Sequence, residues 1–236
     1  PISEVNLDNI TAFMSEGEVQ FDAVNGLKTP IASNGTIALD GREIYQHFVN
    51  WSKNPIMGFE NSISKSSFNN GVAYYRNKKK RPIIYLDTQF SSWNTNQAWE
   101  LELMFRRMRG RQGEFFASTN VSDFIVKSKT STSFTIQGVD FYNSYYNSKI
   151  HKGVAVKDTG GGYAYNKIIS ITTSAGDSII TFQNSWLTTK SVSQLDCVSW
   201  LFLCRFASDN MSFSWTNQNV CDTSVKLQVL EYLTAE

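Results

Sequence analysis

After Gly113 the sequence divides into short β-prone segments that are separated by turn signals. Five such segments are residues 123–127, 133–137, 153–157, 166–172 and 178–182. The intervening clusters 158–162 (DTGGG) and 174–177 (SAGD) are typical of tight turns, because glycine, serine and aspartate suit the backbone angles that turns require. Strands of this length and spacing predict a small β-barrel or β-sandwich.

A single segment has the period of an α-helix. Its apolar residues recur on one face at Ala98, Leu101, Phe105 and Met108. Asn94 or Thr95 can cap the start of this helix, and Gly110 is suited to end it. Acidic residues come early in the segment and arginines late, which complements the helix dipole.

Further strands are predicted on both sides of this helix. Residues 71–76 (GVAYYR) and 82–90 (PIIYLDTQF) are joined by the basic residues 77–81, which predicts a hairpin with a charged turn. The last third of the chain contributes strand candidates at 198–207, 211–215 and 223–230. In the last of these, apolar and polar residues alternate, so one face is expected to be buried and the other wet.

The N-terminal part of the chain is mixed. Residues 7–16 are compatible with a short helix and residues 18–24 with a strand. The pairs Asn25-Gly26 and Asn34-Gly35 are hairpin turn signals. Residues 41–51 fit either a strand or a short helix. The predicted fold class is therefore all-β, with one main α-helix.

Composition limits the function classes. The chain has 236 residues, of which 41% are hydrophobic and 14% aromatic, and this excludes a disordered chain. Lys and Arg number 22 against 21 Asp and Glu, so the formal net charge is +1. Near-neutrality argues against a protein whose main task is to hold nucleic acid or an anionic membrane.

The residues that build metal or disulfide sites are scarce. Cys197, Cys204 and Cys221 form no CxxC pair, and His47 and His151 are the only histidines. We therefore expect no zinc site and no other cofactor. The cluster DTGGG lacks P-loop spacing, no GxSxG motif is present, and no carboxylate pair is marked, so we also expect no enzyme.

Neither a signal peptide nor a membrane span is expected. The first twenty residues carry four acidic side chains and no apolar run. Residues 200–204, the longest apolar run near the end, are too short to span a bilayer. We expect synthesis in a cytoplasm.

Two basic clusters are candidate subunit interfaces. The first is Lys78, Lys79, Lys80 and Arg81, and the second is Arg106, Arg107, Arg109 and Arg111. A solvated hairpin tip explains the first cluster more simply, because it lies between two predicted strands. The helix dipole accounts for much of the second, although arginine is also enriched where proteins meet.

An aromatic patch is the candidate contact for a ligand or a fibre. Its residues are Tyr142, Tyr145 and Tyr146, with Trp186 further along the chain. Tyrosine with interleaved asparagine and serine suits recognition of sugars or proteins. The alternative is a tyrosine-rich loop that packs on its own barrel.

Three stretches resemble one group of proteins. They are residues 99–116 (WELELMFRRMRGRQGEFF), 198–209 (VSWLFLCRFASD) and 211–230 (MSFSWTNQNVCDTSVKLQVL). They are similar to bacteriophage minor tail proteins of the distal-tail or baseplate-hub type, over roughly the C-terminal two thirds of the chain. The resemblance is carried by scaffold patterns, so it assigns no catalytic residues.

The resemblance implies a discontinuous architecture and a structural function. Residues 1–115 and 198–236 would form a β-sandwich ring domain, and residues 116–197 an inserted β-domain; residues 1–60 lie outside the resemblance. Such proteins form homo-oligomeric rings, often sixfold, that link the tail tube to the hub and fibres of the virion. The chain would be made in the host bacterial cytoplasm and carry out no chemistry.

Two rival functions remain open at this stage. A receptor-binding or carbohydrate-binding tail module would use Tyr142, Tyr145, Tyr146 and Trp186 on a host-surface glycan. A depolymerase would need carboxylates that converge in a cleft.

Overall fold

The computed structural model describes residues 38–45, 56–61, 63–67, 73–77, 81–92 and 95–232. All of them belong to one compact unit. The predictions for residues 7–16, 18–24 and the two Asn-Gly turns lie outside the described residues. The described chain is mostly β-sheet with two α-helices, which confirms the predicted fold class.

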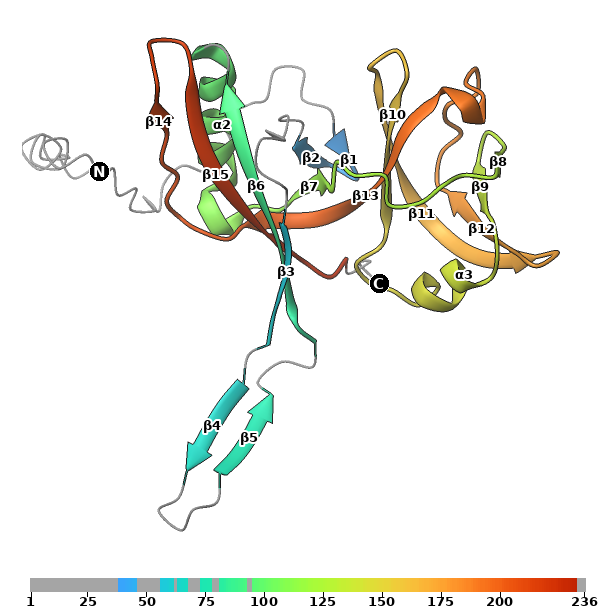
Figure 1. Cartoon of the computed structure of the whole chain (residues 1–236), viewed down its shortest axis with the longest axis horizontal. Helices are drawn as coiled ribbons and strands as arrows, with labels where there is room; N and C mark the ends of the chain where they lie inside the picture. The colour runs from blue at the N-terminus through green and yellow to red at the C-terminus, as the bar shows by residue number, and fades with distance from the viewer. Residues whose placement is uncertain are drawn as a thin grey trace, which may run out of the picture. The chain divides into compact units, whose positions relative to one another are not determined.

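The strands fall into one large mixed sheet and one small sheet (Figure 1). Their bounds are β1 Ala38–Leu39, β2 Arg42–Tyr45, β3 Ile56–Glu60, β4 Ile63–Ser67, β5 Ala73–Asn77, β6 Ile83–Ser92, β7 Phe115–Ser118, β8 Ser128–Lys129, β9 Ser133–Ile136, β10 Gly153–Asp158, β11 Tyr163–Ser174, β12 Asp177–Phe182, β13 Leu195–Phe206, β14 Ser214–Trp215 and β15 Cys221–Val229. The helices are α2 Thr95–Met108 and α3 Asp140–Tyr145. Short 3₁₀ turns occupy Gly110–Gln112 and Val192–Gln194.

Strand β13 connects the two ends of the large sheet. The first part of β13 pairs with β10, and its last part pairs with β7 on one edge and with β15 on the other. β15 in turn pairs with β6, and β6 pairs with β3. β10 leads through β11 and β12 to β9 and β8. The division into a ring domain and an inserted domain at residues 116–197 stays a prediction.

Helix α2 matches its prediction closely. It begins at Thr95 and ends at Met108, and its buried residues are Ala98, Leu101, Met104 and Phe105. Arg109 and Gly110 both have positive φ, at 51° and 58°. A Cβ atom on Gly110 would lie 2.6 Å from Asp209 Oδ1, so glycine is required both by the backbone and by the close approach of Asp209.

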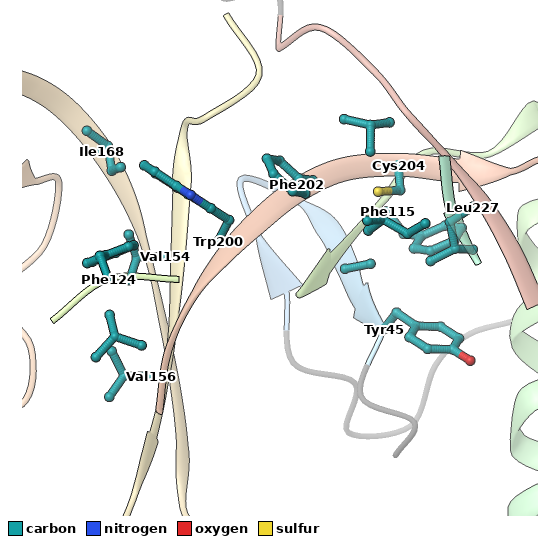
Figure 2. Packing of buried hydrophobic residues seen from close by; sticks show 14 of the residues in the cluster. Tyr45, Phe115, Phe124, Val154, Val156, Ile168, Trp200, Phe202, Cys204 and Leu227 are labelled. Atoms are coloured by element: carbon teal, nitrogen blue, oxygen red, sulfur yellow. The ribbon is translucent and has the colours of Figure 1, made fainter. Parts of the chain in front are cut away.

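The main core lies on one face of β13 (Figure 2). Trp200, Phe202, Cys204 and Phe206 alternate along that strand and are all buried. Phe206 packs against Phe105 of α2 and Phe115 of β7, with ring centroids 4.9 and 4.8 Å apart. Aromatic packing therefore holds helix α2 against β7 and β13.

A smaller core covers the opposite face of β13, where Leu201 and Leu203 pack with Tyr232. A polar cluster closes its rim: Lys167 Nζ donates to Asp40 Oδ2 at 2.6 Å and to the Tyr232 hydroxyl at 2.7 Å, and that hydroxyl donates to Asp40. Burial would raise the pKa of Asp40, but the hydrogen bonds from Lys167 and Tyr232 outweigh it and lower the pKa. The cluster ties the β1–β2 turn to β11 and to the segment after β15.

The predicted strand at residues 123–127 is wrong. The Asp123 carboxylate accepts hydrogen bonds from the backbone N–H of Trp200, at 2.7 Å, and from the Thr119 hydroxyl. The backbone N–H of Trp200 is therefore bonded to a side chain and not to the backbone carbonyl of a paired strand. Burial raises the pKa of this carboxyl. The two hydrogen bonds lower it by less, so the pKa is raised overall. Phe124 and Val126 are still buried, because the irregular segment packs on the core.

The predicted hairpin between residues 71–76 and 82–90 is also wrong. Strand β5 pairs with β4, and β6 pairs with β3 and β15. The chain instead forms a longer hairpin in which β3 and β4 run antiparallel to β6 and β5. The predicted strand 211–215 is reduced to the two residues of β14.

His151 is partly buried against the aromatic core, and from this we predict a loss of stability at mildly acidic pH. Its ring contacts Tyr145, Trp200 and Phe202 at centroid distances of 4.6, 4.6 and 5.2 Å. Burial lowers the pKa of His151 to about 4, from 6.5 in an unfolded chain. Between these two pH values the unfolded state binds a proton that the folded state excludes. We therefore expect stability to fall by about 2–3 kcal/mol as the pH drops from 6.5 to 4.

The measurement for this prediction is urea unfolding at several pH values, for the native chain and for His151→Gln. Other titrating groups, Asp123 among them, contribute to both chains, so their effects cancel in the difference. The variant should lose most of the dependence between pH 6.5 and 4. An identical pH profile in the two chains would contradict the prediction.

Candidate interaction surfaces

Two kinds of site are absent from the described ranges: groups that could bind a metal ion and helices that could span a membrane. No group of three or more His, Cys, Asp or Glu side chains in the described ranges is placed to hold a metal ion. No helix in the part of the chain that the structure describes is long and apolar enough to span a membrane.

Among the arginines near the end of α2, Arg107 is the one that is largely buried. Arg107 donates to both carboxylate oxygens of Glu43 on β2, and the two side chains are only 13% and 11% exposed. Arg106 pairs with Glu102 one turn earlier on the helix. The Arg107–Glu43 pair joins the helix to the sheet, whereas the Arg106–Glu102 pair lies within the helix. The subunit interface at these arginines stays a prediction.

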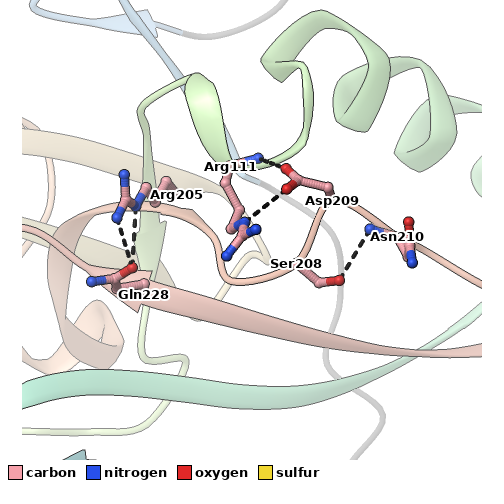
Figure 3. Close-up of polar contacts among 6 residues, drawn as sticks. All are labelled: Arg111, Arg205, Ser208, Asp209, Asn210 and Gln228. Atoms are coloured by element: carbon pink, nitrogen blue, oxygen red, sulfur yellow. Dashed lines mark hydrogen bonds and ion pairs between the residues drawn. The ribbon is translucent and has the colours of Figure 1, made fainter. Parts of the chain in front are cut away.

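Arg111 is similarly engaged (Figure 3). Its backbone N–H and its Nε donate to the two carboxylate oxygens of Asp209, at 2.9 and 2.8 Å. These bonds from Arg111 lower the pKa of Asp209. The Arg111–Asp209 pair fastens the turn after α2 to the loop after β13.

Only one residue of the first basic cluster belongs to the described chain. Lys78, Lys79 and Lys80 are outside the described residues, between the end of β5 and the start of β6. Arg81 is exposed and lies 3.5 Å from Glu231. An exposed ion pair of this kind contributes little to stability.

The aromatic patch is brought together only in part. Tyr142 and Tyr146 stack on each other at 4.7 Å, and Tyr146 is 51% exposed. Tyr145 packs inward against Trp200 at 5.0 Å. Trp186 is buried against Phe134 and Phe182, so its ring is not available as a surface contact.

An exposed apolar surface lies on β3, β4 and β5, outside the candidate sites that the sequence indicated. Large side chains of β3, β4 and β5 are exposed: Ile56 62%, Met57 42%, Phe59 65%, Ile63 54%, Tyr74 61% and Tyr75 67%. None of the side chains that the structure describes on these three strands is buried. We call β3, β4, β5 and the paired part of β6, Ile83–Asp87, the apolar hairpin (Figure 1).

The core face of the sheet continues onto this hairpin without cover. Met57 is opposite Leu86, and Phe59 is opposite Ile84. Leu86 is in turn opposite Leu227, which is buried in the main core. Residues directly opposite each other share a face. Met57 and Phe59 therefore extend the buried apolar face of β6 and β15 into solvent.

The far half of the hairpin is exposed on both faces. Tyr75 is opposite Lys65, whose ammonium group lies 5.8 Å from the centre of the tyrosine ring. Tyr74 is opposite Ser66 and so lies on the other face. Both tyrosines remain largely exposed. The sequence signal for this surface was the cluster of Ile56, Met57 and Phe59 within five residues.

Comparisons with known proteins give no family. No family model matches the chain, and no curated protein matches it. Among solved structures, the chain is similar to the bovine atadenovirus type 4 fibre head protein, with 8% identity over 74% of this chain and 98% of that one. The TM-score is 0.19.

Proposed function

We propose that this chain is a structural protein of a bacteriophage tail tip, a distal-tail or baseplate ring protein that acts by assembly without catalysis. The observation that carries the proposal is the apolar hairpin, which exposes large apolar side chains to water. The resemblance of residues 99–116, 198–209 and 211–230 to distal-tail proteins supports the specific role.

The size of the exposed surface suits a subunit interface. At about 200 Å² for a large side chain, the six exposed residues of the apolar hairpin present roughly 700 Å². A stable interface of standard size takes about 800 Å² from each partner. Because these residues lie on both faces of the hairpin, this area is the sum of two patches and not one continuous patch. The hairpin alone thus supplies most of what one side of an interface needs.

The proposed partners follow from this role. Copies of the chain would form a ring, with sixfold symmetry as in the proteins it resembles, that joins the tail tube to hub and fibres in the virion. A ring needs head-to-tail contacts, in which one surface meets a different surface of the next copy. The near-zero net charge favours such association, since equal copies do not repel one another strongly.

The test is the mass of the purified chain by light scattering over a concentration series, with and without tail-tube protein. We expect a closed ring of several copies, alone or with the tube protein. A chain that stays monomeric at every concentration and does not bind the tube protein would overturn the proposal.

A receptor-binding or carbohydrate-binding module is the second candidate, and it rests on the stacked pair Tyr142 and Tyr146. An exposed tyrosine platform suits the apolar face of a sugar ring. Binding of a bacterial surface polysaccharide should raise the melting temperature of the native chain and not that of Tyr146→Ala. Tyr163→Ala, at another partly exposed stacked tyrosine, is the matched control. No shift with the native chain would exclude this candidate for the polysaccharide tested.

A further inference from the structure

We infer that a cavity where β6 begins and β15 ends binds an acidic peptide, through one carboxylate of the peptide and an aliphatic side chain beside it. The cavity has a volume of about 390 Å³ and is lined by residues 81–83, 149 and 228–231. The backbone N–H of Tyr232 donates to the carbonyl oxygen of Lys149 at 2.8 Å, so the segment with Lys149 is held beside the end of β15. The inference does not depend on the proposed assembly.

The residues that line the cavity include an aliphatic group and a charged group. The aliphatic group is buried or half-buried and consists of Ile83, Val229 and Leu230. The charged group is exposed and consists of Arg81, Lys149 and Glu231. A cavity of a few hundred Å³ with an apolar lining and a small number of polar groups is typical of a ligand site. Exposed charges beside a less exposed aliphatic surface favour a ligand that is itself part apolar and part charged.

The charges of the cavity match a single carboxylate. Arg81 and Lys149 contribute two positive charges and Glu231 one negative charge, so one unit of positive charge is left over. A carboxylate neutralises that charge, whereas a doubly charged phosphate would leave a net negative charge beside Glu231. Arg81 and Glu231 are 3.5 Å apart and both exposed, so their pairing is weak and Arg81 can turn to a ligand at little cost.

Gln228 adds neutral donors to the cavity. Its Oε1 accepts hydrogen bonds from Nε and Nη2 of Arg205, at 3.1 and 3.0 Å (Figure 3). These bonds hold the amide of Gln228 in place and leave its N–H groups as the part that can bind a ligand. An ionised carboxylate only accepts hydrogen bonds, so the donors of Arg81, Lys149 and Gln228 all suit it.

The lining favours a peptide over a sugar acid. Among the described residues that line the cavity none is aromatic, and an aromatic ring is the usual platform for a sugar. The aliphatic side chains of Ile83, Val229 and Leu230 instead suit an aliphatic side chain of the ligand. An acidic residue next to leucine or isoleucine provides both the carboxylate and the apolar group.

The first experiment titrates the full chain with two synthetic peptides in a calorimeter. The peptides are acetyl-Ile-Glu-Leu-amide and acetyl-Ile-Gln-Leu-amide, which have nearly the same shape and differ in charge. We expect the glutamate peptide to bind at one site per chain and the glutamine peptide to bind at least about tenfold more weakly. Equal affinities, or no binding of the glutamate peptide, would overturn the inference.

The second experiment locates the binding with three variants, each checked for folding by circular dichroism. Lys149→Met should raise the dissociation constant of the glutamate peptide at least about tenfold, because it removes one of the two cations. Glu231→Gln should lower the constant by up to about fivefold, because it removes the carboxylate that competes for Arg81. Lys157→Met is the matched control and should leave the constant unchanged, since Lys157 pairs with Asp196 and does not line the cavity. Equal constants for Lys149→Met and Lys157→Met would show that the peptide binds elsewhere.

A third titration, with an oligosaccharide that contains uronic acid, tests the other source of a carboxylate. We expect no binding at this cavity, because the described lining offers no aromatic platform. Binding of the oligosaccharide to the native chain that is lost in Lys149→Met would show that the ligand is a sugar acid, and would overturn the inference of a peptide.

Discussion

Replacing Trp200 with alanine should lower the free energy of unfolding by about 3–5 kcal/mol. Trp200 is 4% exposed and lies on β13, the strand that joins both ends of the large sheet. Its ring packs on Phe124 at 5.1 Å and on Phe141 at 5.6 Å. The irregular segment at 123–127 and helix α3 would both lose their main apolar contact, and the cavity left behind adds to the cost.

Urea unfolding followed by circular dichroism measures this effect. Trp99→Ala is the control, because Trp99 lies on α2 with 61% of its surface exposed. The control should change the free energy of unfolding by less than about 0.5 kcal/mol. A loss below about 1 kcal/mol at Trp200 would show that this aromatic cluster does not hold the sheet together.

Replacing Arg107 with methionine should lower the free energy of unfolding by about 2–4 kcal/mol. Methionine keeps much of the apolar stem of arginine but leaves the carboxylate of Glu43 buried with no cation beside it. The double variant Glu43→Gln/Arg107→Met removes the charge as well. It should therefore be more stable than Arg107→Met alone.

Arg106→Met is the matched comparison, one residue away on the same helix. Its pair with Glu102 is exposed and spans one helical turn, so its loss should cost only about 0.3–0.5 kcal/mol. Equal losses for Arg106→Met and Arg107→Met in urea unfolding would contradict the conclusion that Arg107 clamps α2 to β2.

The sequence predicted elements whose signals are local. The period of Ala98, Leu101 and Phe105 and the glycine at 110 define α2 without knowledge of any other part of the chain. The same holds for β12 and β15, where alternation alone marks the buried face. The dipeptide Asp40-Gly41 is also a local signal for a hairpin turn, and both residues have positive φ, but no turn was predicted there.

Errors arose where distant residues decide the outcome. The segment at 123–127 is rich in β-formers, but Asp123 bonds to Trp200, 77 residues away in sequence. The strand at 73–77 pairs with β4, whose residues Ile63–Ser67 include three serines and give no strong strand signal. Pairing depends on which strands meet, and single-segment patterns do not contain that information.

The candidate surface shows the same limit. The ion pairs of Arg107 and Arg111 could not be predicted from the segment around α2, because their carboxylate partners, Glu43 and Asp209, are far away in the sequence. Trp186 suggested a surface contact because the rings that bury it come from other strands. The exposure of Phe59 was likewise not predictable, because an apolar strand residue is more often buried than not.

The position of β15 between β6 and β13 bears on how the chain folds during synthesis. Ser92 of β6 contacts Cys221 of β15, 129 residues later, so a ribosome must make β7 to β14 before β6 gains this neighbour. Throughout that interval the nascent chain contains β6 but not β15, the strand that later pairs with residues 84–92 of β6. Contacts this distant in sequence slow folding. They also prolong the time during which unpaired, aggregation-prone strands are exposed. Cells that make this protein quickly would need chaperones for that interval, and slower translation should improve its soluble yield.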